Sequence, residues 1–179
     1  NGFGYRQIAE QRFLIRKNLG TQINLSVQFL RFNRQVKSDA LALQNYQLSG
    51  YEAGPELAFQ PNSSNRISAL MQYSTRQNRT GEESARLLKT GIEFRSGMAG
   101  KRSINASFRL TDIVQKGSLQ SPASYEMLEG FLPGRNFTWS LNIQQKLARG
   151  LQLLLTYEGR KSENQRIVHI GKMQANLLF

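Results

Sequence analysis

The feature that most constrains this sequence is the one-by-one alternation of apolar and polar residues over long stretches. Between Phe137 and Gln144 every odd position is apolar and every even position is polar. Successive side chains of a β-strand point to opposite faces of a sheet, so a period of two predicts strands with one apolar face. An amphipathic helix would instead repeat its apolar residues every three or four positions. The sequence therefore predicts an all-β protein.

The same alternation recurs in about nine segments, separated by breaks of two kinds. The predicted strands cover residues 5–16, 21–34, 49–60, 66–75, 87–97, 102–112, 137–146, 150–160 and 166–179. Short breaks contain Gly, Asn and Pro, which favour turn conformations, and they alternate with mostly longer breaks near residues 35–48, 76–86, 113–135 and 160–165. This alternation of short and long connections predicts one antiparallel sheet formed by residues 1–179.

The segment lengths and the connections are typical of a transmembrane β-barrel of the bacterial outer membrane. A tilted strand needs ~9–11 residues to cross the bilayer, and such barrels have short periplasmic turns and long external loops. The mean hydropathy of −0.48 fits this class as well, because only alternate residues contact lipid. Bacterial single-chain barrels normally have an even number of strands. The odd count predicts a larger or even-stranded barrel, with at least one strand upstream or unassigned.

The two parities of the predicted strands differ in chemistry. The apolar parity is expected to face the membrane and includes Leu141, Ile143, Leu153, Leu155, Met173, Ala175 and Leu177. The polar parity is expected to face the lumen, which leaves no second apolar face for a conventional core. Its charged residues are Lys89, Glu93, Arg95 and Arg109, with Glu52, Glu56 and Glu158 as acidic counterparts. They would form either a charged constriction that selects solutes or an ion-pair ladder that fills a closed lumen.

Aromatic residues are expected in two girdles at the membrane interfaces. Phe13, Phe59, Phe94 and Phe179 fall at the predicted lower, periplasmic ends of strands. Tyr51, Tyr73, Trp139 and Tyr157 fall at the upper ends, with Phe29 and Phe32 near them. Phe108 is an exception, since it lies nearer the middle of its segment.

The net charge of +12 would favour nucleic-acid binding in a soluble domain. The cations recur at the ends of predicted strands rather than in one cluster, which instead favours lipid phosphates, including those of lipopolysaccharide. The candidates at the upper rim are Arg31, Arg34, Lys37, Arg76, Arg79, Arg86, Arg160, Lys161 and Arg166. Solvated loop charge is the simpler interpretation of each. A soluble basic β-protein that binds nucleic acid is kept as an alternative class, although the aromatics are expected at membrane interfaces instead.

Residues suited to catalysis or metal binding are scarce. The chain has no Cys and one His, so we expect no disulfide, metal site, cofactor or enzymatic activity. His169 lies inside the last predicted strand with no evident Ser and Asp partners. We expect it to be a strand residue with a hydrogen-bond partner rather than a catalytic or pH-sensing group.

The last predicted strand carries a recognisable pattern at its end. Met173, Ala175 and Leu177 are apolar residues at alternate positions upstream of a terminal Phe179. This resembles the insertion signal read by the barrel-assembly machinery, although Leu177 stands where that signal often has Tyr. The resemblance implies that the machinery is a partner during biogenesis.

The last third of the chain resembles a known group of proteins. The segment 125–139, the residues Tyr157 to Ser162 and His169 are similar to the C-terminal end of large outer-membrane proteins of the Bacteroidota. The resemblance implies the fold and the location, and it brings no catalytic residues. We expect an outer-membrane anchor or a component of an assembly with other outer-membrane proteins; the alternative is a porin-like diffusion or secretion channel.

Overall fold

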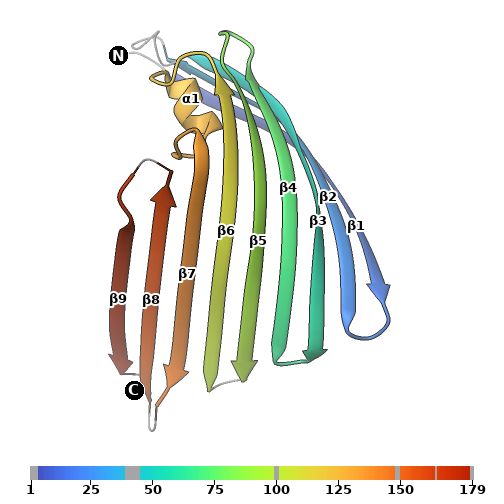
Figure 1. The fold of residues 1–179 in the computed structure, drawn as a ribbon, viewed down its shortest axis with the longest axis vertical. Helices are drawn as coiled ribbons and strands as arrows, with labels where there is room; N and C mark the ends of the chain where they lie inside the picture. Colours follow the sequence, from blue (N-terminus) through green and yellow to red (C-terminus); the bar gives the residue numbers. More distant parts are fainter. Residues whose placement is uncertain (1–3, 39–44, 99–100, 148–149, 164, 178–179) are drawn as a thin grey trace.

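The computed structural model describes residues 4–38, 45–98, 101–147, 150–163 and 165–177. In these ranges the protein is a single sheet of nine antiparallel strands, each paired with its neighbour in sequence (Figure 1). The strands are β1 (Gly4–Leu19), β2 (Ile23–Ser38), β3 (Tyr46–Asn62), β4 (Asn65–Asn78), β5 (Ser84–Met98), β6 (Arg102–Lys116), β7 (Gly134–Lys146), β8 (Leu151–Ser162) and β9 (Val168–Leu177). The all-β prediction and its nine strands are confirmed.

The strands are longer than predicted at one end. We call the edge of the sheet with the short turns the short-turn rim and the opposite edge the long-connection rim. On the long-connection rim β3 begins at Tyr46 rather than at 49, β4 ends at Asn78 rather than at 75, and β6 ends at Lys116 rather than at 112. Outward residues there, such as Gln47 and Gln77, are polar. The alternation therefore ends before the backbone hydrogen bonding does.

Neighbouring strands are offset by a constant amount. One row of paired residues runs across the sheet from Leu19 to Gly171, and at the four short turns it joins Leu19 to Ile23, Phe59 to Ile67, Phe94 to Ala106 and Leu141 to Tyr157. These partners are 4, 8, 12 and 16 positions apart in the sequence. Each hairpin therefore extends two residues further below the row than the one before it, a stagger of one residue per strand.

Two glycines on β3 allow the sheet to bend sharply against β4. A Cβ built on Gly50 or Gly54 would lie 2.1 Å from the carbonyl oxygen of Thr75 or 2.0 Å from that of Met71. Only glycine permits such a close backbone approach, and strand glycines often mark the places where a sheet curves. This close approach lets the sheet curve between β3 and β4 (Figure 1).

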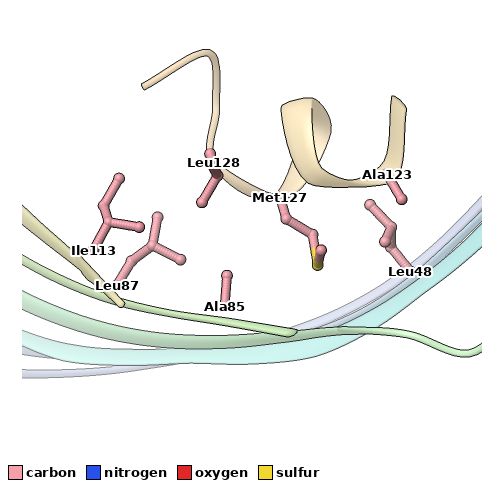
Figure 2. Close-up of a cluster of buried hydrophobic side chains, with 7 residues drawn as sticks. All are labelled: Leu48, Ala85, Leu87, Ile113, Ala123, Met127 and Leu128. Atoms are coloured by element: carbon pink, nitrogen blue, oxygen red, sulfur yellow. The ribbon is translucent and has the colours of Figure 1, made fainter. Parts of the chain in front are cut away.

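The connection between β6 and β7 folds back over one face of the sheet, which we call the inward face. It contains the only helix of the described ranges, α1 (Pro122–Met127). Ala123, Met127 and Leu128 pack on Leu48, Ala85, Leu87 and Ile113 from three strands (Figure 2). The expectation that no second apolar surface exists is therefore wrong at the long-connection rim. No helix in the described part of the chain is long and apolar enough to cross a membrane.

Both edges of the sheet are open in the described ranges. The first strand, β1, pairs only with β2, and β9 pairs only with β8. All residues of β1 are exposed. The sheet is thus curved and staggered but not closed.

Candidate functional site: the inward face and its folded connection

The turn that carries α1 onto the inward face is specified locally. Ser121 caps the helix by accepting a hydrogen bond from the backbone N–H of Ser124 at 3.1 Å, and Pro122 occupies the first turn. After the helix the chain reverses at Glu129 and Gly130, with φ of 56° and 75°. A non-glycine residue in this region costs about 1–2 kcal/mol. The ionic contacts of the Glu129 side chain offset that cost.

Those contacts form a buried ion cluster. Arg76 has a side chain only 6% exposed, and its Nη2 contacts Glu52 at 2.7 Å and also Glu129. Its Nη1 donates to the carbonyl oxygen of Met127 at 2.7 Å. Lys89 donates to both carboxylate oxygens of Glu129, at 2.7 and 2.8 Å. Strands β3, β4 and β5 thus all contribute to fixing the folded connection.

The electrostatics of Glu129 follow from this arrangement. Burial acts to raise the pKa of Glu129, but the charges and hydrogen bonds of Arg76 and Lys89 outweigh it, so the pKa lies below its ordinary value. The carboxylate is therefore ionised at neutral pH and binds both cations. It ties the connection to the sheet most strongly in that state.

A second ion cluster joins the same connection to the first two strands. Glu126, on α1, accepts hydrogen bonds from Arg6 and Arg34, both at 3.1 Å, and Arg34 also contacts Glu10 at 3.1 Å. A cavity of about 390 Å³ lies between the two clusters and includes Arg12, Phe32 and Tyr125 in its lining. Most of its charged groups are already paired with one another, whereas Arg12 approaches Glu10 only at 4.0 Å.

The structure corrects four residues that were predicted on the upper, lipid-facing rim. One is Arg160, which pairs with Thr138 and lies on the inward parity of β8. Arg34 and Arg76 point inward to carboxylates. Phe32 is 5% exposed, and its ring lies against Gly50 and within 5.9 Å of the Arg76 guanidinium carbon. Their even positions place them on the inward parity. The second strand was predicted to end at 34, but β2 continues to Ser38. The inward face therefore extends further toward the long-connection rim than the sequence indicated.

The predicted lumen charges share the inward face but do not form one site. Lys89 belongs to the Glu129 cluster, whereas Glu93 and Arg95 form their own pair at 3.0 Å on β5. Arg109 makes no ion pair in the described ranges. Of the acidic counterparts, Glu52 binds Arg76 and Glu56 binds Arg66 at 2.7 Å. Glu126 and Glu129 were missed because they lie in a predicted loop, where strand parity gives no direction.

The seven residues predicted to face the membrane all lie on the outward face, opposite α1. Ile143, Leu155 and Met173 form one cross-strand row, and Leu153 pairs with Ala175. Leu141 and Leu177 share that parity in the same three strands. Phe59, Tyr73, Phe94, Trp139 and Tyr157 are outward as well. Phe179 lies outside the described residues.

The two-girdle assignment needs correction at Phe13. Phe13 was placed at the lower interface and Phe29 near the upper one, yet they are direct cross-strand partners with ring centroids 6.4 Å apart. Both lie in the middle of the outward face. His169 is a strand residue with a partner, as expected: its Nδ1 lies 2.8 Å from the Tyr157 hydroxyl, and the two rings stack.

No cluster of three His, Cys, Asp or Glu side chains in the described ranges could hold a metal ion. The inward face instead holds ion pairs that fix a connection. No family model and no curated protein matches the chain.

Proposed function

We propose that this chain forms part of the wall of a transmembrane β-barrel in a bacterial outer membrane and serves as a membrane anchor. A continuous apolar belt on the outward face carries the proposal. Its residues lie six and eight positions from the midpoint of each short turn: Ile15, Phe13, Val27, Phe29, Leu57, Pro55, Ala69, Met71, Phe94, Ile92, Ala106, Phe108, Ile143, Leu141, Leu155 and Tyr157. Phe13 and Ile15 expose 63% and 73% of their surface. A belt this large needs an apolar partner.

The thickness of the belt fits a bilayer. Outward ionisable residues limit a charge-free zone on the outward face. The zone is narrowest between Lys17 and Arg31, on β1 and β2, and it is wider between Arg102 and Asp112 on β6. Lys17 and Arg31 lie 4 and 10 positions from the midpoint of the first short turn, so the zone there is six residues deep. Arg102 and Asp112 lie 2 and 12 positions from the midpoint of the third, so the zone on β6 is ten residues deep. With a rise of 3.3–3.4 Å per residue and strands inclined by about 35°, the zone is about 16–27 Å deep. The apolar band of an outer-membrane barrel is about 25 Å tall.

The inclination follows from the stagger and supports a barrel over a flat sheet. One residue of offset per strand, or about 3.3 Å, over a strand spacing of about 4.8 Å gives a tilt of about 35°. Closed barrels have strand tilts of about 35–45°. If the short turns lie at one membrane surface, the strands of this sheet already have the inclination that closure needs.

The folded connection favours an anchor over an open channel. It covers the inward face of β3, β4 and β5 near the long-connection rim, with an apolar cluster and a cluster of ion pairs. A conducting pore would leave these charges facing water, whereas here they bind one another. The proposed barrel is therefore obstructed at its long-connection rim.

Outward cations lie above the belt on the long-connection side. Arg31 and Arg86 are outward in one cross-strand row that also contains Tyr51, and Arg79 donates to Ser49 at 2.8 Å on the same face. One guanidinium group can donate two parallel hydrogen bonds to two oxygens of the same phosphate. We propose that this outward group contacts lipid phosphates, including those of lipopolysaccharide. The barrel-assembly machinery is the proposed partner during insertion.

The single tryptophan offers a direct test of the membrane-facing belt. In a Trp139→Phe background, Leu141→Trp and Ser140→Trp place the indole at adjacent residues on opposite faces. After the full polypeptide is folded into vesicles with brominated acyl chains, Leu141→Trp should be quenched at least twofold and Ser140→Trp much less. Equal quenching of both folded variants, or none of Leu141→Trp, would contradict the proposal.

A further inference from the structure

Both open edges of the sheet run in the same direction. The strand β1 ends at the first short turn, and β9 runs toward the same rim because it pairs antiparallel with β8. Direct pairing of β1 with β9 would therefore be parallel, in a sheet where every other pair is antiparallel. Antiparallel closure requires an odd number of further strands, and the strand beside β1 must run from the short-turn rim upward.

The charges of the inward face indicate what those strands carry. Every inward cation from β2 to β5, namely Arg34, Arg66, Arg76, Lys89 and Arg95, contacts a carboxylate at 3.1 Å or less. The flanks of the sheet differ. On β1, Arg6 contacts Glu126 at 3.1 Å, but Arg12 approaches Glu10 only at 4.0 Å. Arg16 makes no ion pair in the described ranges. On β6 to β9 the inward cations Arg109, Lys146, Arg160 and Lys172 share the face with one strand acid, Glu158. Glu129 of the folded connection lines the same cavity as Arg109 and Arg160.

This inference rests on the proposed barrel. We infer that an odd number of further strands of the same polypeptide completes the wall. The inward side chains of these strands include carboxylates that face Arg12 and Arg16. The same-chain assignment follows from the meander, since each described strand pairs with its neighbour in sequence. By that rule the free edge of β1 belongs to the strand that precedes it. The outward residues of this strand are apolar at the level of Phe13 and Ile15, which continues the belt.

Photo-crosslinking of the full-length polypeptide in cells tests the inference. p-Benzoylphenylalanine at Phe13 samples the free edge of β1, and the same residue at Tyr73 is the matched control, because Tyr73 is outward between Ala53 and Leu88. The control should link to β3 or β5. Phe13 should link to residues that precede Asn1. A crosslink from position 13 to β9 or to a different polypeptide would overturn the inference. So would the absence of any crosslink from position 13 when position 73 does crosslink.

Charge reversal gives a second, independent readout. Arg16→Glu should lower the apparent melting temperature, because it would face the carboxylates of the closing strand, and Arg16→Gln should lower it less. Without such carboxylates the reversal would relieve repulsion among inward cations and leave the melting temperature equal or higher, which would refute the charge assignment. Lys101→Glu, in an exposed short turn, controls for the change in net charge. Absence of the parent polypeptide from the outer membrane would refute the proposed function instead.

Discussion

The indole of Trp139 on β7 fills the space that a side chain at Gly159 on β8 would need. A Cβ built on Gly159 would lie 2.2 Å from Cε2 of the indole, and the two residues are direct cross-strand partners. Gly159→Ala should therefore displace the ring and destabilise the sheet by about 1–3 kcal/mol. The measurement is thermal unfolding together with the emission maximum of the single tryptophan. Gly171→Ala, where a Cβ meets nothing within 4 Å, is the control, and equal effects of the two changes would contradict the packing.

Glu129→Gln should loosen the folded connection, because it removes the charge that Arg76 and Lys89 share. The side chain is 36% exposed, so we expect a loss of about 1–3 kcal/mol rather than the full cost of breaking a buried pair. Glu163→Gln is the control, since Glu163 makes no ion pair in the described ranges. Amide hydrogen exchange of residues 121–131 should rise in the first variant and stay unchanged in the second.

Acid should weaken the same contact. The pKa of Glu129 is lower in the folded state than its ordinary value, so its stabilisation is complete above that ordinary value. It is lost as the pH falls through the folded pKa. Exchange of residues 121–131 in the parent should therefore increase on acidification, and Glu129→Gln should flatten that dependence. An identical pH profile in parent and variant would show that other groups control the connection.

Met127→Asp should detach the connection from the inward face. Met127 is fully buried against the apolar cluster, and an unpaired carboxylate there cannot be satisfied. If the connection obstructs the lumen, single-channel conductance of the reconstituted full polypeptide should rise. Tyr125→Asp, on the exposed side of α1 at 71% exposure, should leave it unchanged. Equal conductance in parent and Met127→Asp would indicate that the obstruction lies elsewhere.

Leu155→Arg and Leu154→Arg make the same change at adjacent residues on opposite faces. Leu155 lies in the belt, so its replacement should cost on the order of 2–4 kcal/mol in lipid. Leu154 faces inward between Gln144 and Gln174, where a cation meets polar groups. Urea titrations of protein folded into vesicles compare the two, and equal stability would invalidate the assignment of faces.

The sequence predicted the strands well because parity is a local property. Ile143 and Leu155 could be assigned to one face without knowing which strands pair. The height of a residue above the short turns was harder to predict, because it depends on the stagger between strands. Phe13 and Phe29 were therefore assigned to opposite interfaces although they are cross-strand partners. The direction of Arg76 was missed for a related reason: its binding partner Glu129 lies on a connection that no periodicity describes.

The constant offset of two residues per hairpin has an evolutionary consequence. Each hairpin is in register with the next by the same rule, from Leu19 and Ile23 to Leu141 and Tyr157. A duplicated or deleted hairpin that preserved this rule would leave all remaining pairings intact and change only the circumference. In the proposed barrel, a wall of this kind can therefore grow by copying two strands at a time, while the belt stays level with the membrane.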